Sequence, residues 1–414
     1  MNNNITIFFI LTLLISQIWG QSTAKTQFLF EKTKIDSTNN SFVWFNGDFK
    51  QNSNSVPNQF LFKFVFPSFI DEETKNNSSN RMNSNNRLGL TLQSELGYST
   101  RFSKNPNITW YFGYGYYDYS AVKFSKDFFE LLFRGNKVFE GKTAELSNFE
   151  LTIKSFQTIT LGISKINENK KLSYGFGFGL ANGFRNQEMK LNKGRLFTST
   201  SGENLLLDVN GDYHFNERES LANGTGVLTN AWLRLNPNKD HSLMISVKNL
   251  GIIRWNNLSR YQKDSSYQFS GLEVGEIFNA NDNLVSNNTS TNIQGLLKLK
   301  KEKKSYSTLL PFDISLNHKW RLTECMSFFS GIDYYHLIGY VPRIHSGLVY
   351  TYSKLNFHSG FAYGGFGGLD YLFGVNFSSR RFFWGSDFQI LEPLLLSKSS
   401  SGVGMNLNLI YKFK

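Results

Sequence analysis

The chain is poor in cysteine and proline. Its 414 residues include one cysteine, Cys325, and 7 prolines. A single cysteine excludes an internal disulfide and a cysteine-based metal site. Scarce proline suits long hydrogen-bonded strands, because proline donates no hydrogen bond to a β-ladder. The shortage of proline is therefore consistent with an architecture made largely of β-strands.

Long apolar runs are missing beyond the first twenty residues. A transmembrane helix needs about 20 consecutive apolar residues, and no such run follows Gly20, which excludes a helical membrane protein. The early run Ile5–Ile15 has the length of a secretory signal and predicts a signal peptide cleaved after Gly20. Asn2–Asn4 replace the usual basic residues, so a buried strand or an uncleaved anchor stays an alternative.

Two-residue alternation is the strongest pattern that the sequence does contain. Large apolar residues occupy Leu172, Tyr174, Phe176, Phe178, Leu180 and Phe184, and small ones occupy Ser173, Gly175, Gly177, Gly179, Ala181 and Gly183. Successive side chains of a strand point to opposite faces, so one face is apolar and the other carries almost no large side chains. A soluble sheet buries its apolar face under a second layer, whereas a membrane barrel turns this face to lipid.

The alternation recurs in segments of about ten residues or more, the length of a tilted strand that crosses a bilayer. Examples are Leu88–Phe102, Phe312–Arg321, Leu355–Tyr363, Leu369–Phe377 and Val403–Phe413. Aromatic residues make 16% of the chain while the mean hydropathy is −0.32, a combination that alternation produces. The sequence therefore predicts an all-β fold, a single antiparallel transmembrane β-barrel, with short turns at one end and longer loops at the other.

The strand number depends on weak segments. Barrels of this kind favour an even number, and we expect about 14 strands, with about 16 as the alternative. The larger number needs strands at Glu188–Phe197, Asn204–His214 and Phe60–Phe66; the smaller one makes the first two a lateral hairpin.

The expected organisation has three parts: a signal peptide at 1–20, an N-terminal extension or plug at 21–59, and the barrel at 60–414. The apolar stretch Phe42–Phe45 indicates that part of the extension is buried, and the polar stretch Gln51–Asn58 is typical of a linker.

Several stretches resemble a family. Val247–Trp255 and Tyr267–Leu272, together with Trp110–Tyr119, Phe128–Asn136 and Gly224–Leu235, resemble motifs of uncharacterised Bacteroidota outer-membrane barrels. The layout is similar to that of the long-chain fatty-acid transporter and of barrels in the type IX secretion system. The resemblance implies a barrel in the outer membrane of the cell and adds no catalytic residue. It also implies recognition by the barrel-assembly machinery, although aromatic Phe413 is penultimate here and Lys414 is last.

Catalytic motifs are missing. The six histidines form no HExxH pair, and no G-x-S-x-G elbow occurs. His345-Ser346 and His358-Ser359 are neighbours in sequence, but adjacent side chains on a strand point to opposite faces and do not meet. We expect no enzyme activity and no cofactor; a lipid-modifying enzyme stays a remote alternative.

If the apolar face meets lipid, the other face lines a lumen. The predicted lumen-lining residues are Glu95, Arg101, Gly175, Gly177, Gly179, Asp313, Lys319, Arg321, Asp333, Arg343, His345, His358, Asp370 and Asp387. Opposite charges on such a wall usually pair across strands and hold it together, but the same residues could line a path for a substrate.

The glycine row at Gly175–Gly183 needs a reason, because glycine weakens a strand. We predict that an inward segment, either the N-terminal Gln21–Gln59 stretch or the Ala121–Leu146 loop, packs against it. The alternative is that small residues only permit strong strand curvature.

Possible partners follow from charge and location. The basic run between Lys298 and Lys304 is placed to hold lipid and lipopolysaccharide phosphates, or else it is a solvated loop flank. A periplasmic or secretion partner is a further candidate. The net charge of +12 does not by itself predict nucleic-acid binding, since no recognition module is visible.

The sequence thus predicts a passive conduit or transporter for small, amphipathic molecules. The alternative is a structural or assembly barrel that serves secretion, motility or envelope organisation; it would have a lumen closed by side chains.

Overall fold

The computed structural model describes residues 41–66, 68–167, 169–202, 204–217, 220, 223–269, 300–389 and 400–413. The predicted signal peptide and residues 21–40 of the predicted extension lie outside these ranges. Among the described residues, none of the helices combines the length and the apolar character needed to cross a membrane.

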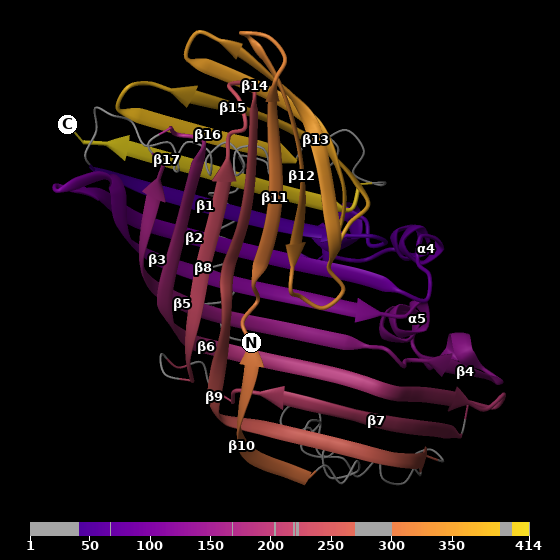
Figure 1. The fold of residues 1–414 in the computed structure, drawn as a ribbon. Coiled ribbons are helices and arrows are strands. Elements are labelled where there is room, and N and C mark those ends of the chain that lie inside the picture. The colour runs from indigo at the N-terminus through magenta and orange to yellow at the C-terminus, as the bar shows by residue number, and fades with distance from the viewer. Residues whose placement is uncertain are drawn as a thin grey trace.

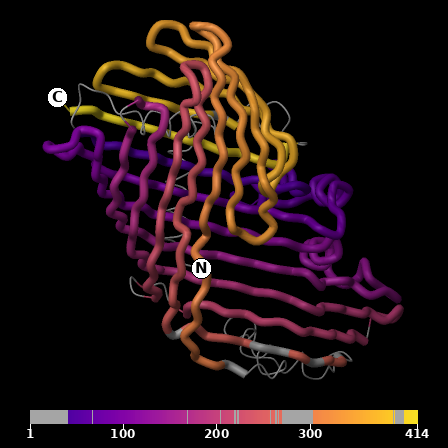
Figure 2. The backbone as a smooth tube through the Cα atoms, viewed as in Figure 1, coloured from indigo at the N-terminus to yellow at the C-terminus, as the bar shows by residue number. Residues whose placement is uncertain are grey.

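Sixteen strands of one antiparallel sheet close into a ring (Figures 1 and 2). They are β1 (Ser41–Ser53), β2 (Asn86–Phe102), β3 (Asn105–Phe124), β5 (Glu150–Ile166), β6 (Leu172–Thr198), β7 (Leu205–Phe215), β8 (Gly224–Leu235), β9 (His241–Phe269), β10 (Lys300–Leu309), β11 (Asp313–Arg321), β12 (Met326–Tyr335), β13 (Val341–Tyr352), β14 (Leu355–Gly365), β15 (Leu369–Ser378), β16 (Phe382–Gln389) and β17 (Gly402–Lys412). The short β4 (Lys142–Glu145) pairs with the far end of β6. The all-β antiparallel fold predicted from the sequence is confirmed.

The ring closes through β1. This strand pairs with β17, where Asn46 faces Asn408, and with β2, where Asn46 faces Glu95. In Figure 2 the indigo start of the described chain accordingly lies beside its yellow end. Residues 41–53 are therefore barrel wall, and their assignment to an extension or plug is wrong. The sequence contains a signal for this strand, since Phe45, Gly47 and Phe49 alternate with Asn46, Asp48 and Lys50 as in the other strands.

Two pairs of strands lie end to end. Both β7 and β8 are antiparallel to β6, β7 along residues 187–198 and β8 along residues 172–183. Similarly, β10 and β11 follow each other along β9. The predicted segment Glu188–Phe197 is thus the second half of β6, and Asn204–His214 corresponds to β7. Whether the ring is described by 14 or 16 strands depends on whether end-to-end strands are counted separately.

Three helices lie at the end of the barrel where β1 ends and β2 begins: α3 (Asn58–Val65), α4 (Glu72–Asn80) and α5 (Lys126–Arg134). We call them the collar; Figure 1 shows α4 and α5 beside the ends of β2 and β3. The strand predicted at Phe60–Phe66 is wrong, because these residues form α3. Alternating phenylalanines imitate a strand there, but Ser53 already pairs with Leu88, so no gap remains between β1 and β2.

The two faces of the wall differ in polarity. Outward side chains such as Phe176 and Phe361 are exposed, at 53% and 51%, whereas inward ones such as Asn46, Glu95 and Asp387 are buried. A soluble protein arranges polarity the other way round. This inverted pattern is the one that a barrel surrounded by lipid requires.

Candidate functional site

Aromatic rings lie flat across inward-facing glycines on one half of the lumen wall. A Cβ on Gly97 of β2 would overlap the indole of Trp44, which also covers Gly113 of β3. A Cβ on Gly162 of β5 or Gly177 of β6 would overlap the ring of Tyr111. Because these glycines carry no side chain, each ring can lie against the backbone instead of projecting into the lumen.

The glycine row of β6 follows the same rule. Gly175 lies under the indole of Trp232, and Gly183 lies under Trp255, which also meets Gly224 at 2.8 Å from the position of a Cβ. The nearest atoms to these glycines belong to the barrel wall and not to residues 41–59 or 121–146. The predicted packing of an inserted segment is therefore wrong for the described residues; residues 21–40 lie outside them.

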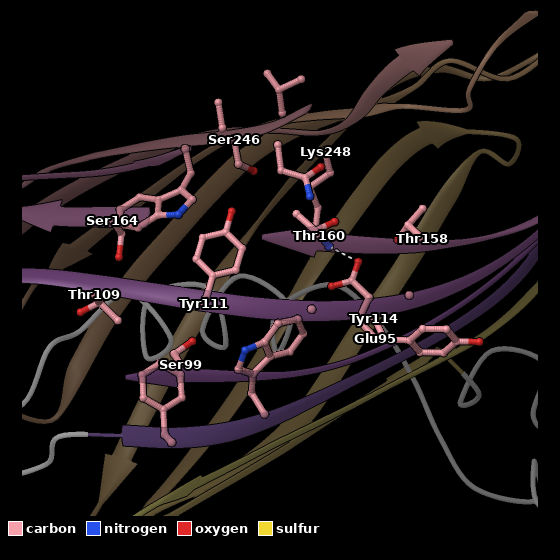
Figure 3. A pocket seen from close by; sticks show the side chains of 18 of the residues that line it. Glu95, Ser99, Thr109, Tyr111, Tyr114, Thr158, Thr160, Ser164, Ser246 and Lys248 are labelled. Atoms are coloured by element: carbon pink, nitrogen blue, oxygen red, sulfur yellow. Dashed lines mark hydrogen bonds and ion pairs between the residues drawn. The ribbon is translucent and has the colours of Figure 1, made fainter. Parts of the chain in front are cut away.

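The flat rings border a cavity of about 100 Å³ inside the barrel (Figure 3). Its aromatic walls come from Phe42, Trp44, Tyr111, Tyr117 and Trp232. Hydroxyl groups also line it, from Ser99, Thr109, Thr158, Thr160, Ser164 and Ser246. The side chain of Thr109 is buried and finds no hydrogen-bond partner among the described residues. A ligand could therefore satisfy it.

An ion pair closes one end of the cavity. The Lys248 ammonium of β9 lies 2.5 Å from a carboxylate oxygen of Glu95 on β2, and the Tyr117 hydroxyl donates to the same oxygen at 2.9 Å. Both charged side chains are largely buried, at 18% and 6% exposure. Figure 3 shows this pair facing the ring of Tyr111 across the cavity. Moving two charges out of water costs free energy, so each charge must be held by its partner and by hydrogen bonds such as the one from Tyr117.

Beyond the ion pair, an apolar cluster spans the lumen. Tyr117, Tyr119 and Phe156 stack on the wall of β3 and β5, with ring centroids 5.0 to 6.2 Å apart. Tyr340, from the turn between β12 and β13, and Phe366, from the turn between β14 and β15, belong to the same cluster.

The lumen is closed by these two turns, between β12 and β13 and between β14 and β15, which reach across to β2. Arg87 of β2 donates to the carbonyls of Phe366 and Gly367 at 3.1 and 3.0 Å, and Gln93 donates to the Tyr335 hydroxyl at 3.2 Å. Because β2 and β12–β15 are distant in the ring, these contacts cross the lumen. In the described residues, inward turns of the barrel itself thus fill the place expected for an N-terminal plug.

The other half of the wall is polar. His358 of β14 bonds to Asp387 of β16 across Gly374, which leaves room for both side chains. Arg343 lies 3.4 Å from Asp370, which also accepts from Asn52 at 3.1 Å.

Neighbouring contacts extend this polar wall. His345 lies 3.3 Å from Asp333, and Asn46 donates to Asn408 at 2.5 Å. These pairs join successive strands and tie the wall together.

The predicted lumen-lining residues lie in different parts of the wall. Glu95, Gly175, Gly177 and Gly179 lie on the cavity half, and Asp333, Arg343, His345, His358, Asp370 and Asp387 lie on the polar half. Asp313 is buried beside Lys248, while Arg101 and Lys319 are half-buried on the inward side near the short turns. Arg321 lies outside the enclosed wall: it is exposed and pairs with Asp240 at 3.3 Å.

Sequence reasoning missed the aromatic members of the cavity and Lys248. From the sequence alone, Trp44 falls in the predicted extension and Tyr111 in an aromatic strand with no assigned face. Their inward parity, shared with Gly113 and Gly115 on β3 in the case of Tyr111, was the available signal. The described residues contain no group of three or more His, Cys, Asp or Glu side chains arranged to hold a metal ion.

The chain is similar to several solved structures. Among them are the toluene transporter TodX of P. putida (10% identity, TM-score 0.42, 90% of each chain covered), a Pseudomonas aeruginosa FadL homologue (10%, 0.42, 91% of each) and the CymD monoaromatic hydrocarbon channel (8%, 0.34, 91% of this chain and 89% of that one). No curated protein matches the chain. Residues 42–365 match the model of a family of unknown function, DUF5723, and the chain therefore belongs to that family.

Proposed function

We propose that the protein is an outer-membrane barrel that conducts small, amphipathic molecules through its lumen, and that it is exported by a signal peptide cleaved after Gly20. The observation that carries this proposal is the cavity of about 100 Å³ inside a barrel whose outer face is apolar. A catalytic role is not part of the proposal.

The lining of the cavity matches such a solute. Apolar parts would contact the faces of Tyr111 and Trp232, both of which are half-buried. A polar group would bond to the free hydroxyl of Thr109 or to the Glu95–Lys248 pair. Concave sites with apolar walls and a few placed polar groups are typical of small-molecule binding.

The orientation follows from the connections. The short turns, such as Ser353–Lys354 between β13 and β14, would face the periplasm, and the collar would face outward. Lys303 and Lys304 of β10 would then lie on the outer side, where they could hold lipopolysaccharide phosphates. Origin in Bacteroidota and insertion by the barrel-assembly machinery remain part of this proposal.

A structural or assembly barrel is the second candidate, and the apolar cluster favours it. Tyr340 and Phe366 close the lumen beside the cavity, so conduction requires their two turns to move. A barrel that only organises the envelope needs no such movement.

Solute entry into liposomes separates the two candidates. We expect purified barrel to admit a small phenol faster than protein-free liposomes do, and faster than a sugar of similar volume. The variant Thr109→Val, which keeps the shape and removes the hydroxyl, should slow the phenol selectively. Entry no faster than in protein-free liposomes would reject the conduit and leave the structural barrel.

A further inference from the structure

The helix α3 is apolar on two sides. Phe60 and Leu61 are buried, and the ring of Phe60 packs against Phe129 and Phe133 of α5 with centroids 5.2 and 4.8 Å apart. A second set of apolar residues in and just after the helix is exposed: Phe62, Phe64, Val65, Phe66 and Phe69. We call this set the α3 patch; Phe69 is 84% exposed and Phe64 59%. A helix that is apolar all round is normally covered on every side.

The collar sits on the outward face of the barrel wall. The cluster that buries Phe60 and Phe129 includes Leu88 of β2 and Val122 of β3. Leu88 shares its strand face with Leu96, one of the exposed outward residues, with no change of register between them. The helices therefore cover the same face that carries the exposed outward apolar residues, such as Leu96 and Phe176. We call these exposed residues the apolar belt.

The height of the collar can be set against the membrane. From Phe102 to Leu88, β2 is about 46 Å long, at about 3.3 Å per residue. A tilt of about 40° reduces this to a height of about 35 Å, against a hydrocarbon core of about 30 Å. If the belt begins near Phe102, Leu88 lies where hydrocarbon gives way to headgroups. Leu90 and Leu92 continue the outward row from Leu88, and only the small Ser94 separates them from Leu96, so the collar adjoins the belt.

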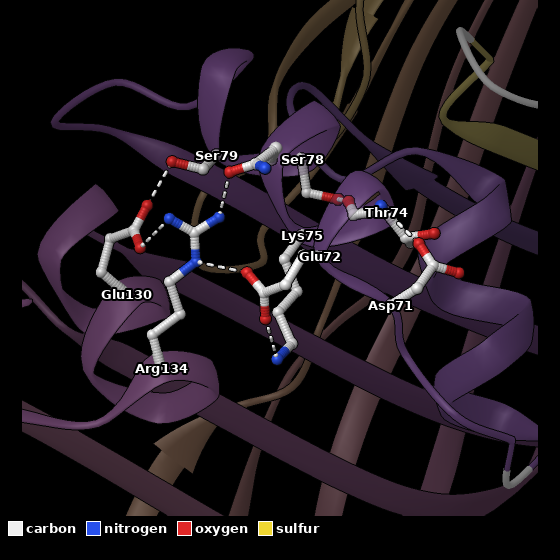
Figure 4. Close-up of polar contacts among 9 residues, drawn as sticks. Asp71, Glu72, Thr74, Lys75, Ser78, Ser79, Glu130 and Arg134 are labelled. Atoms are coloured by element: carbon white, nitrogen blue, oxygen red, sulfur yellow. Dashed lines mark hydrogen bonds and ion pairs between the residues drawn. The ribbon is translucent and has the colours of Figure 1, made fainter.

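The neighbouring helix α4 has the opposite character. Its sequence EETKNNSSN contains no apolar residue. Figure 4 shows how it is fixed to α5: Arg134 pairs with Glu130 at 3.2 Å and reaches Glu72 at 3.8 Å, while Ser79 bonds to Glu130. On the other side, Lys63 of α3 pairs with Asp71, the N-cap of α4. One rigid unit thus presents an apolar helix and a polar helix side by side.

We propose that the α3 patch inserts into the outer leaflet at the boundary between acyl chains and headgroups, with α4 left in water. The proposal uses the membrane placement above but not the conduit. Two observations support lipid as the occupant: the collar packs on the same outward row of β2 that carries the belt, and the neighbouring α4 offers the patch no apolar side chain to pack against. The estimated height of Leu88, with the belt taken to begin near Phe102, agrees with this occupant. Interfacial helices bury their apolar face about 5–10 Å into this boundary.

Depth-dependent quenching tests the proposal. The exposed thiol is removed by Cys325→Ser, and single cysteines are placed at Phe64, Phe69, Leu161 and Asn80. Each carries the same environment-sensitive fluorophore in phosphatidylcholine vesicles with bromine at a shallow or a deep chain position. Leu161 is an exposed belt residue of β5, and Asn80 is an exposed residue of α4. Heat-modifiable migration on a gel confirms that each variant is folded.

We expect shallow bromine to quench Phe64→Cys and Phe69→Cys, deep bromine to quench Leu161→Cys, and neither to quench Asn80→Cys. If Leu161→Cys is quenched while the two patch positions behave like Asn80→Cys, the proposal is overturned and the membrane placement stands. If Leu161→Cys is not quenched either, both fail. Efficient disulfide cross-linking between two Phe69→Cys copies, without quenching, would overturn the lipid in favour of a second copy of the chain.

Discussion

The two halves of the lumen wall differ in the side chains that occupy their inward positions. On β2–β9, several inward glycines lie under flat aromatic rings such as those of Tyr111 and Trp232. On β12–β17, they carry paired polar groups such as His358 with Asp387 and Arg343 with Asp370. The outer face carries exposed large apolar residues around both halves.

The difference teaches how a barrel can keep space inside it. Rings that lie against glycine leave the lumen open in front of them, and the cavity is found on that half. Polar side chains that reach each other across strands fill the space with hydrogen bonds, which makes that half a scaffold. Breaking the scaffold should therefore cost stability, whereas altering the cavity half should mainly change what passes.

Arg343→Met should have the largest effect, because it breaks the polar half. Arg343 is almost fully buried, and its loss leaves the buried Asp370 carboxylate without the guanidinium that pairs with it. Removing one partner of such a pair costs about 3–5 kcal/mol. The measurement is the free energy of unfolding in urea with the barrel in lipid vesicles. The double variant Arg343→Met/Asp370→Leu should recover much of the loss; no recovery would mean that the pair is not coupled.

Arginine on the outer face should have the same effect in both halves. Phe176→Arg on β6 and Phe361→Arg on β14 each place a charge in the apolar belt, at a cost of roughly 2–4 kcal/mol near the bilayer midplane. Unfolding in lipid vesicles measures both. A clear cost for one variant and none for the other would show that the two halves differ in lipid contact and not only on their inner faces.

Gly162→Ala should have a smaller effect on stability and a specific effect on the cavity. The new methyl group overlaps the ring of Tyr111, so the ring must lift from the wall into the cavity. Overpacking of this kind costs about 1–3 kcal/mol, and entry of a small phenol into liposomes should slow. Gly47→Ala is the control, since Gly47 lies on the outward side of β1, where its Cβ would meet the side chain of Phe45 at 3.2 Å and nothing else closer than 3.9 Å. Equal slowing by both variants would contradict the assigned role of the glycines.

The smallest expected effect is a local change in the collar. The collar belongs to neither half of the wall, so a change there should leave both halves unaffected. The hydrogen bond from Lys63, with two from Thr74, holds the pKa of Asp71 well below its ordinary value of 3.8. The stabilisation is therefore complete above pH 3.8 and is lost as the pH falls through the lowered pKa. We expect α4 to become protease-sensitive only under strong acid, and Asp71→Ala to make it sensitive at neutral pH. An unchanged cleavage rate in Asp71→Ala would show that the cap does not hold α4.

The face of each strand could be predicted because two-residue alternation is local. The same rule misplaced Phe60–Phe66, where a helix carries an alternating sequence by coincidence. What a single sequence does not contain is the register between distant strands. The contact of Trp255 with Gly183 depends on this register. The ion pair of Lys248 with Glu95, which are 153 residues apart, forms only when the ring has closed. The inward course of the turns at Tyr340 and Phe366 had no local signal either, because short turns look alike whether they point in or out.

Cysteine modification during conductance recording tests most directly whether solutes follow the cavity half. In a Cys325→Ser background, Thr160→Cys places a thiol in the cavity and Asn376→Cys places one on the buried inner face of the polar half. A small methanethiosulfonate reagent should reduce the conductance of the Thr160→Cys barrel in a planar bilayer and leave that of Asn376→Cys unchanged. An unchanged conductance at Thr160→Cys, or an equal reduction at both positions, would contradict a path along the aromatic and glycine wall.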